Sequence, residues 1–111
     1  MSHRGIITVP KDRAAQVALD HDEALPEQLL EITLGAAVMA RLWEVGFFAR
    51  INAIAGTMLD MYEDDSIEEM NVLEKVLSSD VFEMYEGPIV QQIKTLFTCA
   101  LEWKTGVCFY L

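Results

Sequence analysis

The strongest constraint on the fold is a long apolar stretch in the middle of the chain, at residues 32–59. Its 28 residues carry only three charged side chains, those of Arg41, Glu44 and Arg50. Apolar residues fall on all sides of a helix drawn through this stretch, a pattern typical of a helix that other elements cover on most sides. We therefore expect it to form the centre of the core, and the expected core residues are Leu42, Trp43, Phe47, Phe48, Ile51, Ile54, Met58 and Leu59.

The same stretch is long enough to be considered as a membrane-spanning helix. Charged side chains inside a membrane are costly, so the three charges argue against a span. The first ten residues, MSHRGIITVP, lack the apolar core of a secretory signal. Two cysteines, Cys99 and Cys108, suit a reducing compartment and need not pair. The sequence therefore predicts a cytoplasmic protein that does not enter a membrane.

The length of 111 residues predicts one domain, residues 1–111. A single helix across residues 26–62 would be far longer than the mean of about 11–12 residues. Because Gly46 interrupts the stretch, we expect two helices, at residues 26–45 and 47–63, or one helix bent at Gly46. Pro26 suits the first position of such a helix because its missing N–H group has no helical partner there.

Further helices are expected on both sides of this pair. Residues 11–19 favour a short helix. Ser66 and Glu69 have the spacing of a capping box that would open a helix ending near Leu77. Asp80 resembles a second cap, and Gly87-Pro88 precedes an amphipathic helix that Gly106 ends.

The two ends of the chain, residues 4–9 and 107–111, have strand character, and whether they pair stays open at this stage. The helical segments between them dominate the pattern. The expected fold is mainly α: a small single-domain helical bundle around a central hydrophobic helix or helix pair, with short terminal strands as the open point.

Charge is the main clue to function. With 8 basic and 18 acidic residues, the net charge is −10, which disfavours direct binding to nucleic acid or to an anionic membrane surface and favours a basic partner. Residues 60–86 hold ten acids and one base, Lys75, and residues 20–31 hold five acids and no base. A solvated face with helix caps explains this composition equally well. In the functional interpretation, the acids form a docking surface, with partner-binding residues Asp60, Tyr62, Glu63, Asp64, Asp65, Glu68, Glu69, Glu83, Tyr85 and Glu86.

No motif points to catalysis, a metal or a cofactor. The segments from Asp60 and from Asp64 both lack the glycine and the final glutamate of a calcium-binding loop. The histidines and cysteines lack the spacing of a zinc site, and no nucleophile elbow or phosphate-binding loop occurs. Arg41 and Glu44 are expected to form a helical ion pair, and Arg50 to reach the surface. The alternative places the two arginines at the mouth of a pocket.

The composition favours a non-enzymatic acidic binding protein. Its most concrete form is a bacterial immunity or inhibitor protein that neutralises a basic toxin, such as a nuclease, by occluding the cationic residues with which the toxin holds phosphate. One alternative is an obligate helical oligomer or a small structural subunit, because residues 32–59 offer excess apolar surface. A second alternative is a helical protein that binds a small molecule near Arg41, Trp43 and Glu44.

Overall fold

A computed structural model describes residues 5–60 and 64–111 of the chain. Five α-helices, two 3-10 helices (η) and four strands lie within these residues. In chain order they are β1 (Ile6–Pro10), α1 (Arg13–Asp20), η1 (Pro26–Gln28), β2 (Leu29–Thr33), α2 (Ala36–Glu44), α3 (Phe47–Ala55), β3 (Asp64–Ile67), α4 (Met70–Leu77), η2 (Val81–Glu83), α5 (Pro88–Trp103) and β4 (Val107–Tyr110).

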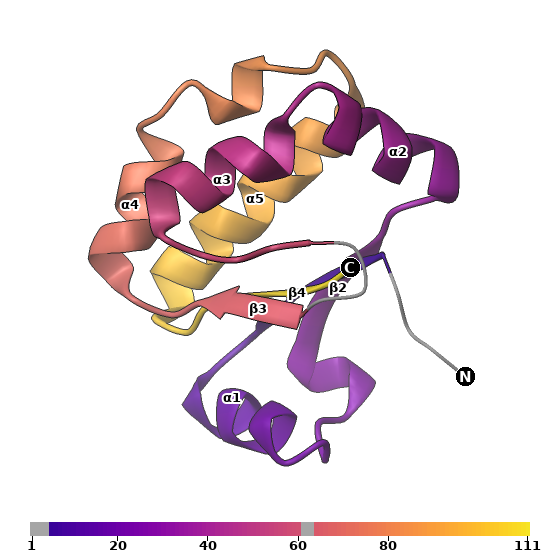
Figure 1. Cartoon of the computed structure of the whole chain (residues 1–111). Helices are drawn as coiled ribbons and strands as arrows, with labels where there is room; N and C mark the ends of the chain where they lie inside the picture. Colours follow the sequence, from indigo (N-terminus) through magenta and orange to yellow (C-terminus); the bar gives the residue numbers. More distant parts are fainter. Residues whose placement is uncertain (1–4, 61–63) are drawn as a thin grey trace.

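The strands form one antiparallel sheet in the order β2-β1-β4-β3. Helices α3, α4 and α5 lie on one side of the sheet, and α1 lies on the other (Figure 1). The two terminal segments do pair, with Ile7 of β1 opposite Phe109 of β4, and they form the centre of the sheet. The expected mainly α bundle is therefore wrong, because the chain has an α+β fold in which a four-stranded sheet supports the helices.

Strand β2 replaces the first half of the helix expected at residues 26–45. Pro26 does start a helical turn, but this turn is only the 3-residue 3-10 helix η1. The chain then pairs with β1, and Leu30 and Ile32 pack against the core while Glu31 is exposed. The apolar spacing of this segment fits a helix or a strand, so the available partner strand decided between them.

The capping box expected at Ser66 is also absent. Ser66 lies within β3, opposite Cys108 of β4. Helix α4 begins at Met70, and Glu69 at its N-cap makes no side-chain hydrogen bond to the helix. Pairing with β4 holds residues 64–67 extended, so the serine hydroxyl never reaches a helix N-terminus.

The central stretch is divided among β2, α2 and α3. The division at Gly46 is confirmed: its φ of 84° lies in the left-handed region, which glycine adopts without the clash of a Cβ atom. Helix α3 ends at Ala55 rather than at residue 63, whose position lies outside the described residues. Across residues 5–60 and 64–111, no helix has both the length and the apolar character needed to cross a membrane.

Most of the expected core residues are confirmed. Leu42, Phe47, Phe48, Ile51 and Leu59 are buried, and Trp43 and Ile54 are partly buried against them. The prediction that Met58 belongs to the core is wrong, because 81% of its surface is exposed. Met58 follows the end of α3 in a segment without regular secondary structure, so its side chain is no longer held on the inner face of a helix.

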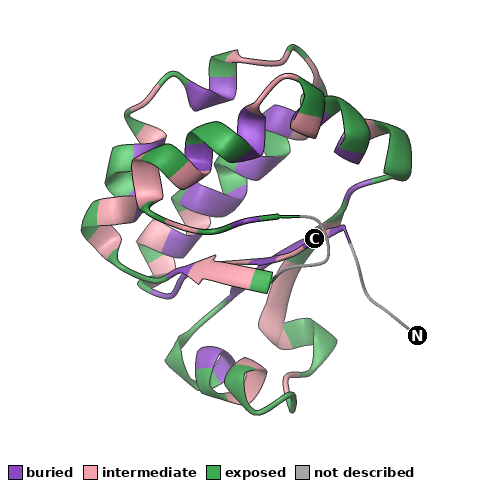
Figure 2. Cartoon of the chain, in the orientation of Figure 1, coloured by how far each residue is buried: buried purple, intermediate pink, exposed green. Residues whose placement is uncertain are grey.

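The core lies between the helices and one face of the sheet, where the buried residues gather (Figure 2). Helix α5 confirms the amphipathic pattern expected of it, since Ile93, Leu96, Phe97 and Ala100 are buried. A continuous series of aromatic contacts crosses this core from α2 to β4. Its successive ring centroids lie 4.8, 5.4, 6.1, 5.6 and 6.1 Å apart, through Trp43, Phe48, Phe47, Phe82, Phe97 and Phe109.

Candidate protein-binding surface

Helix α1 covers only part of the second face of the sheet. It packs over β1, where Thr8 is completely buried. The Asp12 carboxylate caps the helix by accepting the Ala15 N–H at 2.7 Å, and Gln16 Nε2 donates to Glu68 Oε1 at 3.1 Å. Beside the C-terminal end of α1, a pocket of about 300 Å³ is left open, lined by Asp20, Asp64, Asp65, Ser66, Cys108 and Tyr110.

Strand pairing places most of the pocket lining on one face. Asp64 lies opposite Tyr110, and Ser66 lies opposite Cys108. Residues directly opposite each other in a sheet project to the same side, so these four side chains share one surface. Asp20, the last residue of α1, completes the lining from the other side. The two acidic clusters of the sequence, residues 20–31 and 60–86, therefore meet in space at this pocket.

Burial and the acidic surroundings change the proton affinity of two groups in the pocket lining, the Cys108 thiol and the Tyr110 hydroxyl. Burial, with a further contribution from the carboxylates of Glu68 and Asp20, raises the pKa of the Cys108 thiol to about 12, against a hydrogen bond with Tyr110 that lowers it. Burial also raises the pKa of Tyr110, with added effects from Cys108 and Asp64. Both groups stay neutral near pH 7, so Cys108 is not an activated nucleophile. The charge of the pocket comes from its carboxylates, which favour a cation.

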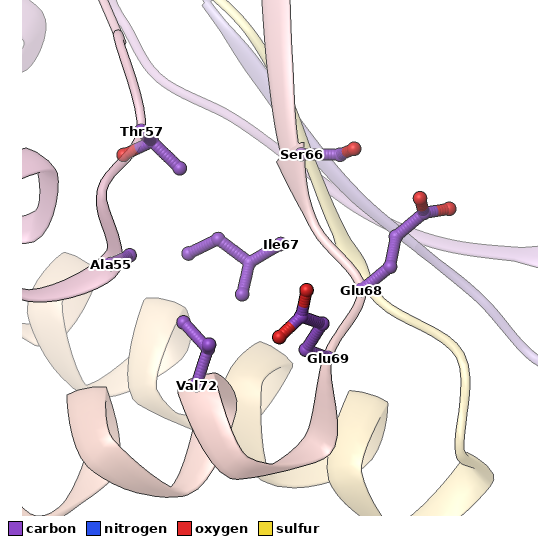
Figure 3. A pocket seen from close by; sticks show the side chains of 7 residues that line it. All are labelled: Ala55, Thr57, Ser66, Ile67, Glu68, Glu69 and Val72. Carbon is purple, nitrogen blue, oxygen red and sulfur yellow. The ribbon is translucent and has the colours of Figure 1, made fainter.

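A smaller pocket of about 90 Å³ lies on the other side of β3, lined by Ala55, Thr57, Ser66, Ile67, Glu68, Glu69 and Val72. In Figure 3, Ile67 points between Thr57 and Val72, while Glu68 points away from them. The carboxylates of Glu68 and Glu69 thus diverge, although the residues are consecutive. Only Glu68 approaches α1 and the larger pocket, through its bond with Gln16.

The predicted partner-binding residues do not form one surface. Asp64, Asp65 and Glu68 lie at or beside the larger pocket, and exposed Asp60 precedes β3. Glu69 lines the smaller pocket. Glu83 ends η2, and Tyr85 and Glu86 lie on the connection from η2 to α5; this segment is at the far side of the helical layer from β3 (Figure 1). Tyr62 and Glu63 lie outside the described residues.

Four residues that line the larger pocket were not predicted as a site: Asp20, Ser66, Cys108 and Tyr110. Asp22, which lies near enough to Tyr110 to raise its pKa, was not predicted either. The two aspartates belong to an acidic cluster that nothing in the sequence connects with β3. The alternation of Cys108 and Tyr110 with buried Phe109 does show in the sequence. It would identify a face of β4 opposite the core, but not the acids beside it.

The two arginines of the central stretch form exposed ion pairs. Arg41 Nη1 lies 3.1 Å from Glu44 Oε1, as expected for residues three apart on a helix. Arg50 Nη2 lies 3.3 Å from Asp80 Oδ1. Asp80 therefore binds an arginine and makes no side-chain cap hydrogen bond to η2, although the short turn expected after it does form. Exposed pairs of this kind contribute about 0–1 kcal/mol, which fits a minor structural role.

Within the part of the chain that the structure describes, no group of three or more histidine, cysteine, aspartate or glutamate residues is arranged to hold a metal ion. No known protein family model matches the sequence. Searches among curated proteins and among solved structures likewise found no match. Any functional conclusion therefore depends on the geometry and charge described above.

Proposed function

We propose that this protein is a non-enzymatic binding protein that recognises a basic protein through an acidic face formed by Asp20, Asp22, Asp64, Asp65 and Glu68. One observation carries the proposal: the fold brings two acidic segments, about 40 residues apart in sequence, to one open pocket. Covering a core does not require this arrangement, because the pocket lies on the face of the sheet that is turned away from the core. The net charge of −10 adds long-range attraction for a basic partner.

The pocket suits one long basic side chain. Its volume of about 300 Å³ lies at the lower end of the range for small-ligand sites. Asp20 and Asp64 offer carboxylate acceptors for an ammonium or a guanidinium group, and the ring of Tyr110 offers a surface for cation–π contact. The mechanism is steric: a lysine or arginine held here is withdrawn from its own function on the partner.

A nuclease toxin is the most concrete partner, because a nuclease holds phosphate with lysines and arginines. In that version the protein is a cytoplasmic immunity protein of a bacterium. Both cysteines are free thiols, which suits a reducing compartment. An acidic protein would compete with nucleic acid for the cationic cleft without itself binding nucleic acid.

The test is an affinity capture from native cell extract at low and high salt, with mass spectrometry of the retained proteins, followed by association kinetics with the captured protein. Two matched variants carry the same change of charge: Asp20→Lys with Asp64→Lys at the pocket, and Glu83→Lys with Glu86→Lys on the distant connection. We expect a basic partner whose association is slowed at least about tenfold by the pocket variant and much less by the control.

Two outcomes contradict the proposal. The first is equal slowing by both variants, which would mean that only the net charge matters. The second is a self-associated oligomer that retains no basic protein at either salt concentration, which would favour the alternative of a structural subunit.

A further inference from the structure

The sheet has two edge strands, β3 and β2, and the β3 edge is partly closed by its own side chains. The pairing of β4 with both neighbours directs the backbone groups of Asp65 and Ile67 toward β4 and those of Ser66 outward. The Ser66 N–H is satisfied by Asp65 Oδ1 at 2.8 Å. The second oxygen of Asp65 accepts the Met58 N–H at 2.9 Å, which ties residues 57–60 beside this edge.

The β2 edge is open by comparison. The Leu34 N–H donates to the Gly5 carbonyl, and the Lys11 N–H donates to the Gln28 carbonyl. These bonds show that the backbone N–H and C=O groups of the even-numbered β2 residues point toward β1. The backbone groups of Leu29, Glu31 and Thr33 therefore point outward. The Leu29 N–H turns back to Pro26. Within the described residues, the outward backbone groups of Glu31 and Thr33 have no hydrogen-bond partner beyond β2.

The side chains of β2 indicate what a further strand would need. Leu30 and Ile32 face the helices but are only partly buried, whereas their neighbours on β1, Val9 and Ile7, are completely buried. Apolar side chains on an added strand would cover the rest of Leu30 and Ile32. Glu31 lies between them, exposed on the opposite face, and would lie beside the intervening side chain of that strand.

A second copy of this chain fits the edge poorly. The antiparallel pairing of two β2 strands that uses all outward groups of Glu31 and Thr33 sets Glu31 of each copy opposite Thr33 of the other, because the Leu29 N–H is already bonded to Pro26. The two Glu31 side chains are then diagonal neighbours on one face, within reach of each other, and each copy carries a net charge of −10. Charge complementarity instead requires a basic residue at this position.

We propose that the β2 edge accepts an extended segment of a partner protein that reads apolar–basic–apolar. The backbone of the segment pairs with Glu31 and Thr33, its basic residue lies beside Glu31, and its apolar residues cover Leu30 and Ile32. This surface is separate from the acidic face, because β2 and β3 are opposite edges of the sheet. A substitution can therefore abolish binding at the β2 edge without affecting the acidic face, and the reverse.

The test uses a blocked synthetic peptide with the repeated pattern Val-Lys-Val and a control peptide with glutamate in place of each lysine. Amide chemical shifts and hydrogen exchange are measured in the full chain. We expect the lysine peptide, and not the glutamate peptide, to slow exchange at the Glu31 and Thr33 amides at least tenfold. Unchanged exchange at both amides under saturating lysine peptide, or protection at β3 alone, would overturn the proposal.

Two further variants test the edge geometry. Thr33→Pro removes an outward N–H while leaving the bonds to β1, and Thr33→Val keeps the N–H as the matched control. We expect protection of the Glu31 amide to vanish in Thr33→Pro and to persist in Thr33→Val; equal protection in both would refute the pairing. If Thr33→Pro fails to fold, Glu31→Lys tests the pairing instead. In this variant the β2 edge should bind the glutamate peptide in preference to the lysine peptide. An unchanged preference would contradict the role of Glu31.

Discussion

The two faces of the sheet differ in composition and in cover. Toward the helices, Ile7, Val9 and Phe109 are completely buried and join the aromatic contacts of the core. Toward α1, the same strands carry Thr8 and Tyr110, and helix α1 leaves the pocket beside β3 open. Successive side chains of a strand point to opposite faces of the sheet. The same strands therefore support a dry apolar layer on one face and a polar surface with an open pocket on the other.

This difference separates stability from recognition. Burial of apolar surface is the main favourable term in folding, and it is concentrated on the helix-covered face. A cluster of carboxylates could not lie there, because a buried unpaired charge costs several kcal/mol. On the partly covered face, water solvates the acids, so the fold can hold them together without losing the core.

The sharpest test of this division compares aromatic side chains on the two faces. Phe97→Ala should cost about 3–5 kcal/mol of unfolding free energy, because the ring is completely buried between Phe82 and Phe109. Tyr110→Ala should cost less than half as much, since Tyr110 is only partly buried. Urea-induced unfolding measures both values. Equal costs would show that the two faces contribute alike.

A second test uses alkaline pH. The Cys108 thiol loses its proton near its ordinary pKa of 9.0 in the unfolded chain but only near 12 in the folded protein. Between these values the folded state binds more protons, so the unfolding free energy should fall as the pH rises, by about 1.4 kcal/mol per pH unit for one whole proton.

Tyr110 acts in the same direction, because its pKa is also raised in the folded state. The stability loss between pH 9 and 12 should therefore be shallower, but still present, in Cys108→Ala. Denaturant midpoints across this range give the slope. An identical slope in the variant would mean that the thiol titrates as it does in the unfolded chain.

The smallest change in unfolding free energy is expected from a substitution of Thr8, which lies on the part of the same face that α1 covers. Its Oγ1 is buried without a hydrogen-bond partner among residues 5–60 and 64–111, which leaves the cost of removing the hydroxyl from water uncompensated. Thr8→Val should raise the unfolding free energy by about 1 kcal/mol. The same substitution at exposed Thr33 on β2 is the control and should stay within about 0.5 kcal/mol. A destabilised Thr8→Val would mean that the hydroxyl has a favourable role.

The parts of the fold that followed from sequence are those with local signals. Helix α5 has a proline at its first turn and a clear amphipathic pattern, and the structure places it at Pro88–Trp103. The break at Gly46 follows from a glycine between two helical patterns. Residues 4–9 and 107–111 showed strand character, and β1 and β4 lie there.

The errors fell on β2 and β3, where local signals conflict with pairing. Pro26 and the leucines after it suit a helix, and two aspartates in β3 have low strand propensity. Each strand forms because β1 or β4 offers an unpaired edge, and Asp65 then satisfies the outward N–H of Ser66. A partner from a distant part of the chain can override local propensity, and a single sequence does not reveal that partner.

The sequence by itself determined the acidic charge, the apolar centre and the positions of most helices, because these depend on composition and on spacing within one turn or one strand. Only the tertiary structure decided that the chain has an α+β fold and that Asp20 and Asp64 share a pocket with Tyr110. It also separated Glu83 and Glu86 from that pocket. The physical reason is that hydrogen bonding between strands joins residues far apart in the chain, and no local pattern records which strands meet.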